Sequence, residues 1–134
     1  MIDSIINEID KALKVLTVSQ YPQRSRPDVN FKASDALTSQ ERESHSKYMR
    51  VNHSGEVCAQ ALYRGQLFFN KNKKIEKKLE VAAAEELDHL AWCQSRIKEL
   101  GGTTSFLNPI LYLGSFTIGS IASIIDEKYN LGFL

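Results

Sequence analysis

The chain is poor in the residues that cross-link a fold or interrupt regular structure. Its 134 residues include two cysteines, three prolines and seven glycines. Two cysteines, Cys58 and Cys93, are too few for the disulfide framework of a small secreted protein, so we expect a reduced, intracellular setting. The low content of glycine and proline excludes a collagen-like chain and favours long regular elements.

Neither sign of charge is in excess. Lys and Arg number 17 against 16 for Asp and Glu, a net charge of +1, so bulk charge gives no reason to expect a nucleic-acid partner. Residues 1–8 carry Asp3 and Glu8 but no basic side chain, which fits neither a secretory signal nor a transit peptide. The composition that remains, 43% hydrophobic and 25% charged residues, is typical of one globular domain.

One long stretch, from Leu100 to Ile125, has no charged residue. It exceeds the length that a helix needs to span a bilayer. Glycines and a proline recur within it: Gly101, Gly102, Pro109, Gly114 and Gly119. Because these residues make the stretch only weakly apolar, we expect a buried or membrane-surface helix at least as readily as a spanning one. Its apolar side chains suit a greasy substrate or a membrane face.

The N-terminal part is predicted to be a helix followed by a connector. Apolar residues at helical spacing predict a short amphipathic helix over residues 2–17. The next segment, 18–37, contains Pro22 and Pro27 among scattered polar groups and is expected to be extended. We therefore treat residues 1–38 as a lead-in to the main domain.

Two long helices are expected next. Thr38 and Glu41 have the spacing of a capping box, with Thr38 as N-cap, and open a helix that runs to about residue 70. A second helix runs from about residue 73 to residue 100, where the glycine pair at 101–102 ends it. The short loop between the two helices implies that they are antiparallel neighbours.

A further helix completes the predicted domain over residues 39–134. Asn108 is expected to be its N-cap, Pro109 lies in its first turn, and it should run to about Lys128. No strand pattern with a period of two is present. The fold class is therefore all-α: an antiparallel helical bundle, reduced to a long hairpin with flanking helices.

Each hairpin helix has a stripe at heptad-like spacing that we expect to face the core. In the first helix the stripe is Met49, Asn52, Glu56, Ala59, Tyr63 and Leu67 or Gln66; in the second it is Ile75, Leu79, Ala82, Glu86, His89, Cys93, Ile97 and Leu100. Glu56 lies about 14 residues before the loop and Glu86 about 14 after it. In an antiparallel hairpin Glu56, Glu86 and His89 should therefore converge at one depth.

This trio predicts a metal site. A buried carboxylate without a partner costs several kcal/mol, so something must compensate it. Glu86 and His89, three residues apart, share one helical face. Carboxylate and imidazole ligands suit iron or manganese. One Glu from one helix and Glu-x-x-His from the next form half of the ligand set of a dimetal bundle.

The sequence also permits interpretations of Glu56 and His89 that need no metal. Glu56 could pair with Arg50, Arg64 or a lysine, and His89 could be a hydrogen-bonded core histidine. For a lone histidine that interpretation would prevail, whereas the three-residue constellation favours a metal.

Five other side chains carry weaker expectations. Cys58 and Cys93 are expected to be small buried hydrophobes, and Tyr63 a packing residue. His53 is either a supporting partner of the site or a polar surface residue. Asp88 either orients a ligand histidine of a neighbouring helix, or is solvated or forms a salt bridge between helices.

Three blocks of the sequence resemble the demethoxyubiquinone hydroxylases of ubiquinone biosynthesis. They are RVNHSGEVCAQALYRGQ at 50–66, AEELDHLAWC at 84–93 and SFLNPILYLGSFTIG at 105–119, within a likeness that covers roughly residues 45–134. The resemblance implies a ferritin-like bundle with a non-haem di-iron centre. It also implies oxygen-dependent hydroxylation of the ring of a polyprenyl demethoxyubiquinol. Peripheral attachment to the bacterial inner membrane, on its cytoplasmic side, follows from the same resemblance.

The resemblance also implies roles for the three candidate ligands. Glu56 would be a terminal ligand of one of two iron ions, Glu86 would bridge them and His89 would complete one coordination sphere. Members of the family carry a second Glu and a second Glu-x-x-His. After His89 this sequence contains Glu99, Asp126 and Glu127 as its only acids and no histidine.

The sequence thus holds half of the expected ligand set. We expect first that the chain is a partial hydroxylase, inactive alone. The second expectation is a homodimer in which two hairpins complete one site, and the third is a separate chain that carries the missing half. The competing functions are a non-enzymatic iron-binding bundle and a metal-free helical interaction module.

Overall fold

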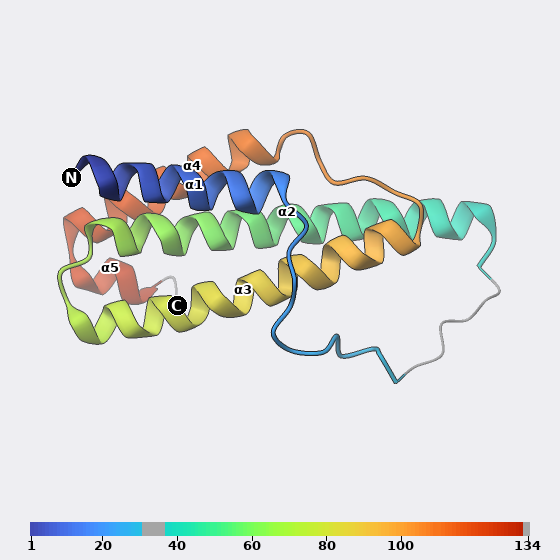
Figure 1. Ribbon diagram of the computed structural model, residues 1–134, viewed down its shortest axis with the longest axis horizontal. Helices are drawn as coiled ribbons and strands as arrows, with labels where there is room; N and C mark the ends of the chain where they lie inside the picture. Colours follow the sequence, from blue (N-terminus) through green and yellow to red (C-terminus); the bar gives the residue numbers. More distant parts are fainter. Residues whose placement is uncertain (31–36, 133–134) are drawn as a thin grey trace.

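The computed structural model describes residues 1–30 and 37–132, where all regular structure is helical. The five helices are α1 (Ile2–Thr17), α2 (Ser39–Phe69), α3 (Lys73–Glu99), α4 (Asn108–Ile125) and α5 (Glu127–Gly132). α2 packs most extensively against α4 and then against the antiparallel α3, while α1 lies beside α4 (Figure 1). The predicted all-α bundle is confirmed. Within the predicted connector, residues 31–36 lie outside the described part.

The hairpin forms at its predicted boundaries. The Thr38 hydroxyl accepts a hydrogen bond from the Glu41 amide (3.2 Å), and the Glu41 carboxylate accepts one from the Thr38 amide (2.8 Å). The predicted capping box therefore opens α2. At the turn, the Asn72 side chain accepts a hydrogen bond from the Lys74 amide (2.9 Å) and caps α3.

α3 ends at the predicted glycine pair. Gly101 has a φ of 75°, in the left-handed region that a side chain disfavours. The Gly102 amide then donates to the carbonyl oxygen of Ile97 (2.9 Å), which terminates the helix. A β-carbon at Gly102 would lie only 1.8 Å from the hydroxyl oxygen of Ser46, so the turn also packs tightly against α2.

Both predicted ends of the last long helix are corrected. Leu107 is the N-cap of α4 and makes no side-chain cap. Asn108 is instead the first residue of the helix, and its side chain bonds to Ser54 and His53 of α2. The C-terminal end lies at Ile125 rather than near Lys128, because Asp126 is extended (φ −164°, ψ 147°) and separates α4 from α5.

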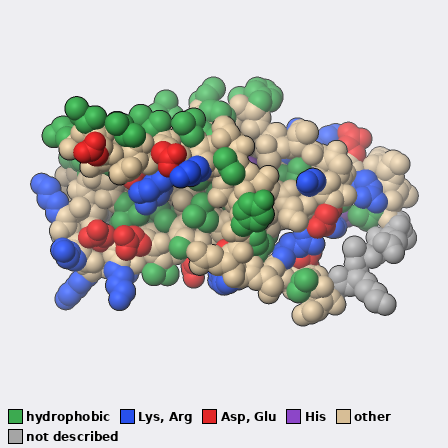
Figure 2. All heavy atoms as spheres, viewed as in Figure 1, with side chains coloured by type: hydrophobic (Ala, Val, Ile, Leu, Met, Phe, Trp, Pro, Cys, Tyr) green, Lys and Arg blue, Asp and Glu red, His purple; other side chains and the backbone are tan. Residues whose placement is uncertain are grey.

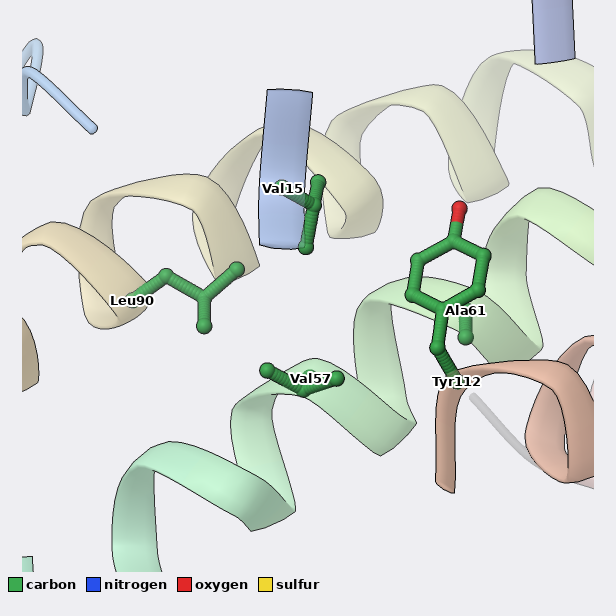
Figure 3. Packing of buried hydrophobic residues seen from close by; sticks show 5 residues of the cluster. All are labelled: Val15, Val57, Ala61, Leu90 and Tyr112. Carbon is green, nitrogen blue, oxygen red and sulfur yellow. The ribbon is translucent and has the colours of Figure 1, made fainter. Parts of the chain in front are cut away.

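The core lies where four helices meet. Figure 3 shows Val15 of α1, Val57 and Ala61 of α2, Leu90 of α3 and Tyr112 of α4 pointing toward one another. Each of the five is at most 6% exposed, so α1 contributes to the same core as the hairpin. The predicted division at residue 38 stays a prediction.

Hydrophobic side chains also gather outside this core. On α1 the exposed ones are Ile2, Ile5, Ile6, Ile9 and Leu13; on α4 they are Ile110, Leu111, Leu113, Ile118, Ile121, Ile124 and Ile125. Figure 2 shows hydrophobic side chains gathered along the edge that α1 and α4 form. We call these twelve residues the α1/α4 apolar face. α4 has a mean hydropathy of 1.4 with 28% of its residues buried, so by length and composition alone it could cross a membrane.

Candidate metal centre

The antiparallel helices α2 and α3 bring Glu56, Glu86 and His89 together, as the predicted alignment of the hairpin requires. The Nδ1 atom of His89 lies 3.1 Å from Oε2 of Glu86 and 3.7 Å from Oε2 of Glu56. One ligand atom from each of the three residues lies within 4.8 Å of the others. Among the described residues, this is the one cluster of three or more such groups. The predicted convergence is therefore confirmed, and the role of the trio as ligands stays a prediction.

The trio is less buried than its predicted place on a core stripe requires. The side chains of Glu56, Glu86 and His89 are 28%, 16% and 37% exposed. The fully buried positions of the hairpin, such as Val57 and Leu90, instead face α1 and α4. The expected stripe of α3 is buried at both ends and wrong in its middle, whereas of the stripe of α2 only Gln66 is buried. The reason is that the apolar helices α1 and α4 cover a different face of the hairpin.

The two carboxylates disfavour each other's charge. Burial raises the pKa of Glu56 to about 7, helped by its hydrogen bond to Glu86 and by repulsion from the Glu86 carboxylate, while His89 acts in the opposite direction. When both carboxyl groups are ionised, their repulsion raises the free energy of the folded state. A cation bound between them would remove that cost.

Arg50 and Arg64, which could have neutralised the Glu56 carboxylate, bind other residues instead. Arg50 donates from Nε to the carbonyl oxygen of Thr103 (2.8 Å). Arg64 forms an ion pair with Glu8 of α1, with Nε 3.0 Å from Oε2. This arrangement argues against the alternative in which either arginine neutralises Glu56.

The donor set fits a divalent transition metal. Two carboxylates and one imidazole are ligand types that iron and manganese accept. Three protein ligands leave coordination positions open, as a metal that reacts with a substrate requires. His89 is neutral when it ligates, and a carboxylate ligand must be ionised, so binding would release the proton that Glu56 retains near neutral pH.

The two cysteines and Tyr63 are not part of this donor cluster. Cys93 is buried and free, and burial, with a smaller effect of Glu56, raises its pKa to about 11. It therefore stays a protonated, small hydrophobe, as predicted. Cys58 is free and half-buried. The pKa of the half-buried Tyr63 is raised, first by burial and then by Glu86 and Glu56.

His53, one helical turn before Glu56 on α2, is buried against α4. It is 2% exposed, and its Nδ1 lies 3.2 Å from the Asn108 side-chain nitrogen. Burial lowers its pKa, so the ring is neutral. Because it is buried against α4, it is not a surface residue, and its role as a supporting partner of the site stays a prediction.

Asp88 forms a salt bridge, but with the connector rather than between helices, and its carboxylate is buried rather than solvated. Its buried carboxylate accepts hydrogen bonds from Arg24 Nε (2.7 Å) and from the Gln23 amide (2.6 Å). Both partners belong to the connector after α1. No sequence pattern predicted this attachment or the part of Trp92 in it, although Trp92 follows His89 by one helical turn.

A groove of about 460 Å³ opens beside the trio. Residues 26–28 of the connector, Trp92 and Arg96 line it together with Glu56 and His89. Glu56 and His89 can thus be reached from the connector side of the hairpin.

Comparison with known proteins identifies relatives over the whole chain. The family described as Ubiquinone biosynthesis protein COQ7 matches residues 43–134. A 3-demethoxyubiquinol 3-hydroxylase of Polynucleobacter necessarius is 44% identical over 99% of this chain and 64% of its own length. Enzymes of that name from Bordetella parapertussis and Chromobacterium violaceum are 49% and 45% identical, over 99% and 100% of this chain and 60% and 65% of their own lengths.

The chain spans less than two thirds of each of these relatives. No solved structure matches it. The ferritin-like topology that the resemblance implies therefore remains a prediction.

Proposed function

The chain belongs to the family of the ubiquinone biosynthesis protein COQ7, and we propose that it supplies half of a di-iron centre that hydroxylates the ring of a polyprenyl demethoxyubiquinol. The observation that carries the proposal is the convergence of Glu56, Glu86 and His89 within 4.8 Å. The name shared by relatives that are 44–49% identical supports the reaction.

The trio would hold the iron. Glu56 would bind one ion terminally, Glu86 would bridge two ions and His89 would complete one coordination sphere. Bound iron supplies the activation of dioxygen, chemistry that no side chain provides. The carboxylates neutralise positive charge, and the open groove leaves one side of the trio accessible to a ring.

A second set of ligands must complete the centre. Di-iron bundles use two Glu and two Glu-x-x-His motifs, and the described residues offer one cluster. We propose that the remaining ligands come from a second copy of the hairpin or from a complementing C-terminal half. Mass measurement of the iron-loaded species distinguishes these sources.

We further propose that the α1/α4 apolar face rests on the cytoplasmic side of the bacterial inner membrane. Family membership and the exposed apolar helix α4 both indicate membrane association. A position on the membrane surface suits α4 better than one across the membrane. One side of α4 packs along α2, and α2 carries the charged Arg64, which a bilayer interior would disfavour. The prenyl tail of the substrate would then stay in the lipid.

The decisive test is iron binding by matched variants. After anaerobic loading with Fe(II), we expect the wild-type chain to retain iron and Glu86→Ala to lose most of it. The control is Glu85→Ala, which removes the neighbouring exposed carboxylate of the same helix and should retain iron. Less than about a tenth of an iron per wild-type chain would favour a metal-free interaction module.

Turnover separates an enzyme from a non-enzymatic iron-binding bundle. The completed, iron-loaded species should incorporate one oxygen atom from ¹⁸O₂ into a reduced demethoxyubiquinone ring. Stable iron binding without incorporation would favour the bundle that only binds iron.

A further inference from the structure

The connector after α1 is fastened along α3 beside the candidate ligands. We call residues 20–28 the strap. At its start the Gln20 amide donates to Oε1 of Gln94 (3.0 Å). Toward its end the Arg26 guanidinium donates to the Ser95 hydroxyl (3.2 Å) and to the Glu99 carboxylate (2.5 Å). The strap thus lies against the second half of α3 rather than leaving the bundle.

The middle of the strap is held by Asp88, which directly precedes His89. The Asp88 side chain is 6% exposed, and each of its oxygens accepts one hydrogen bond from the strap. One bond comes from the Gln23 backbone and the other from the Arg24 guanidinium. The buried Asp88 carboxylate binds both the backbone amide of Gln23 and the guanidinium of Arg24. It therefore fixes the path of the strap and the position of the charged Arg24 side chain.

Trp92 joins the strap to His89. The indole N–H of Trp92 donates to the carbonyl oxygen of Arg24 (3.1 Å), and the Arg24 guanidinium carbon lies 5.5 Å from the centre of the indole ring. The indole also packs against the imidazole of His89, with ring centres 5.2 Å apart and planes tilted by 46°. Arg24 therefore touches Asp88, which directly precedes His89, and Trp92, which lies one helical turn after it.

We propose that the strap positions the His89 ring for metal binding, with Arg24 and Trp92 as the positioning residues. The imidazole can rotate about its bond to Cβ, and its metal-binding nitrogen must point toward Glu56 and Glu86. The packed indole limits that rotation, and Arg24 holds the indole in place. This inference rests on the proposed metal centre but concerns residues outside the ligand set and, for Arg24, outside the matched family segment.

Binding of Co(II) alone to the full chain tests the proposal. Arg24→Ala removes the ion pair with Asp88 and the guanidinium that lies over the Trp92 ring, and leaves the backbone carbonyl that accepts from the indole. We expect the affinity for Co(II) to fall roughly 10- to 100-fold, the usual effect of losing a residue that supports a ligand. The visible spectrum of bound Co(II) should also change, because the geometry at His89 changes. Arg24→Lys keeps the positive charge and should recover part of the affinity.

Two controls separate positioning from general destabilisation. Lys47→Ala removes the cation of an exposed ion pair on α2 (Lys47–Glu43) and should leave affinity and spectrum unchanged. Trp92→Phe keeps an aromatic ring against His89 but removes the N–H donor, so its loss of affinity should be smaller than that of Arg24→Ala. Circular dichroism should show each variant to be as helical as the wild type.

The outcomes are distinct. If the wild type binds Co(II) and Arg24→Ala binds it within about twofold and with the same spectrum, the strap has no positioning role. If the folded wild type binds no Co(II), the metal centre itself fails and this inference with it. In the metal-free chain, loss of nuclear Overhauser contacts between the His89 and Trp92 rings in Arg24→Ala would support the proposal, and their persistence would overturn it.

Discussion

Gly65 of α2 and Gly119 of α4 bring the backbones of their helices into direct contact. A β-carbon at Gly65 would lie 2.1 Å from the carbonyl oxygen of Phe116, and one at Gly119 would lie 2.1 Å from that of Leu62. The obstructing atoms are backbone, which cannot rotate away. The two helices can therefore approach this closely only because both positions lack a side chain.

We expect Gly65→Ala and Gly119→Ala each to lower the free energy of unfolding by roughly 2–4 kcal/mol, since overpacking must push the helices apart. Chemical denaturation followed by circular dichroism measures the change. Gly55→Ala is the matched control, because its β-carbon would meet nothing within 4 Å. At this exposed position in a helix interior, alanine should stabilise the chain by about 0.5–1 kcal/mol.

The raised pKa of Glu56 predicts a pH dependence of the metal-free chain. Its pKa is about 7 in the folded state against an ordinary 4.5, so its favourable contribution is complete below pH 4.5 and is lost as pH rises through 7. Glu56→Gln should therefore gain stability relative to the wild type between pH 4 and 8, by about 2 kcal/mol after allowance for partial exposure. Denaturant titrations at several pH values measure this difference.

Glu43→Gln supplies a control of opposite sign. Lys47 lowers the pKa of the exposed Glu43, so this carboxylate contributes stability above its ordinary pKa that is lost as pH falls. Glu43→Gln should accordingly lose stability relative to the wild type at high pH. A pH-independent difference between wild type and Glu56→Gln would contradict the assigned shift.

The ion pair of Glu8 and Arg64 should fasten α1 to α2. Their side chains are only 13% and 16% exposed. Arg64→Met leaves Glu8 half-buried with Lys11 as its remaining cation, and should cost roughly 2–4 kcal/mol. The double variant with Glu8→Gln should cost less than Arg64→Met alone, because no uncompensated charge remains. Equal or greater cost in the double variant would show that the pair is not the cause.

The α1/α4 apolar face should bind lipid. Ile121→Asp places a charge on it and should weaken binding to phosphatidylethanolamine–phosphatidylglycerol vesicles roughly 10- to 100-fold, the equivalent of one buried isoleucine. Vesicle sedimentation measures the partition. Val81→Asp adds the same charge at an exposed apolar residue of α3, away from this face, and should leave binding unchanged. Similar losses in both variants would indicate a general effect of charge.

Local chemistry made the helix boundaries predictable. The capping box at Thr38 and the glycine pair at 101–102 act through neighbouring backbone groups, so their effect can be recognised in sequence. Asn108 misled the prediction, because an asparagine before a proline also suits a cap. Its side chain serves a tertiary contact with His53 and Ser54 instead.

The register of the hairpin made the convergence of Glu56, Glu86 and His89 predictable. Their partial exposure was not, because it depends on which face α1 and α4 cover. The attachment of Arg24 to Asp88 spans 64 residues, and no periodic pattern marks such a contact. An arginine in an extended connector gives no signal of the residue with which it pairs.

The chain has a single tryptophan, and it lies between Arg24 and the candidate ligand His89. Fluorescence of this protein therefore reports on the connector and the histidine rather than on the helix core. Denaturation followed by indole emission records release of the connector, whereas the amide signal records melting of the helices. If the indole signal changes at a lower denaturant concentration than the amide signal, the connector detaches before the helices melt. The difference between the two midpoints then measures how much less stable the attachment of the connector is than the helices.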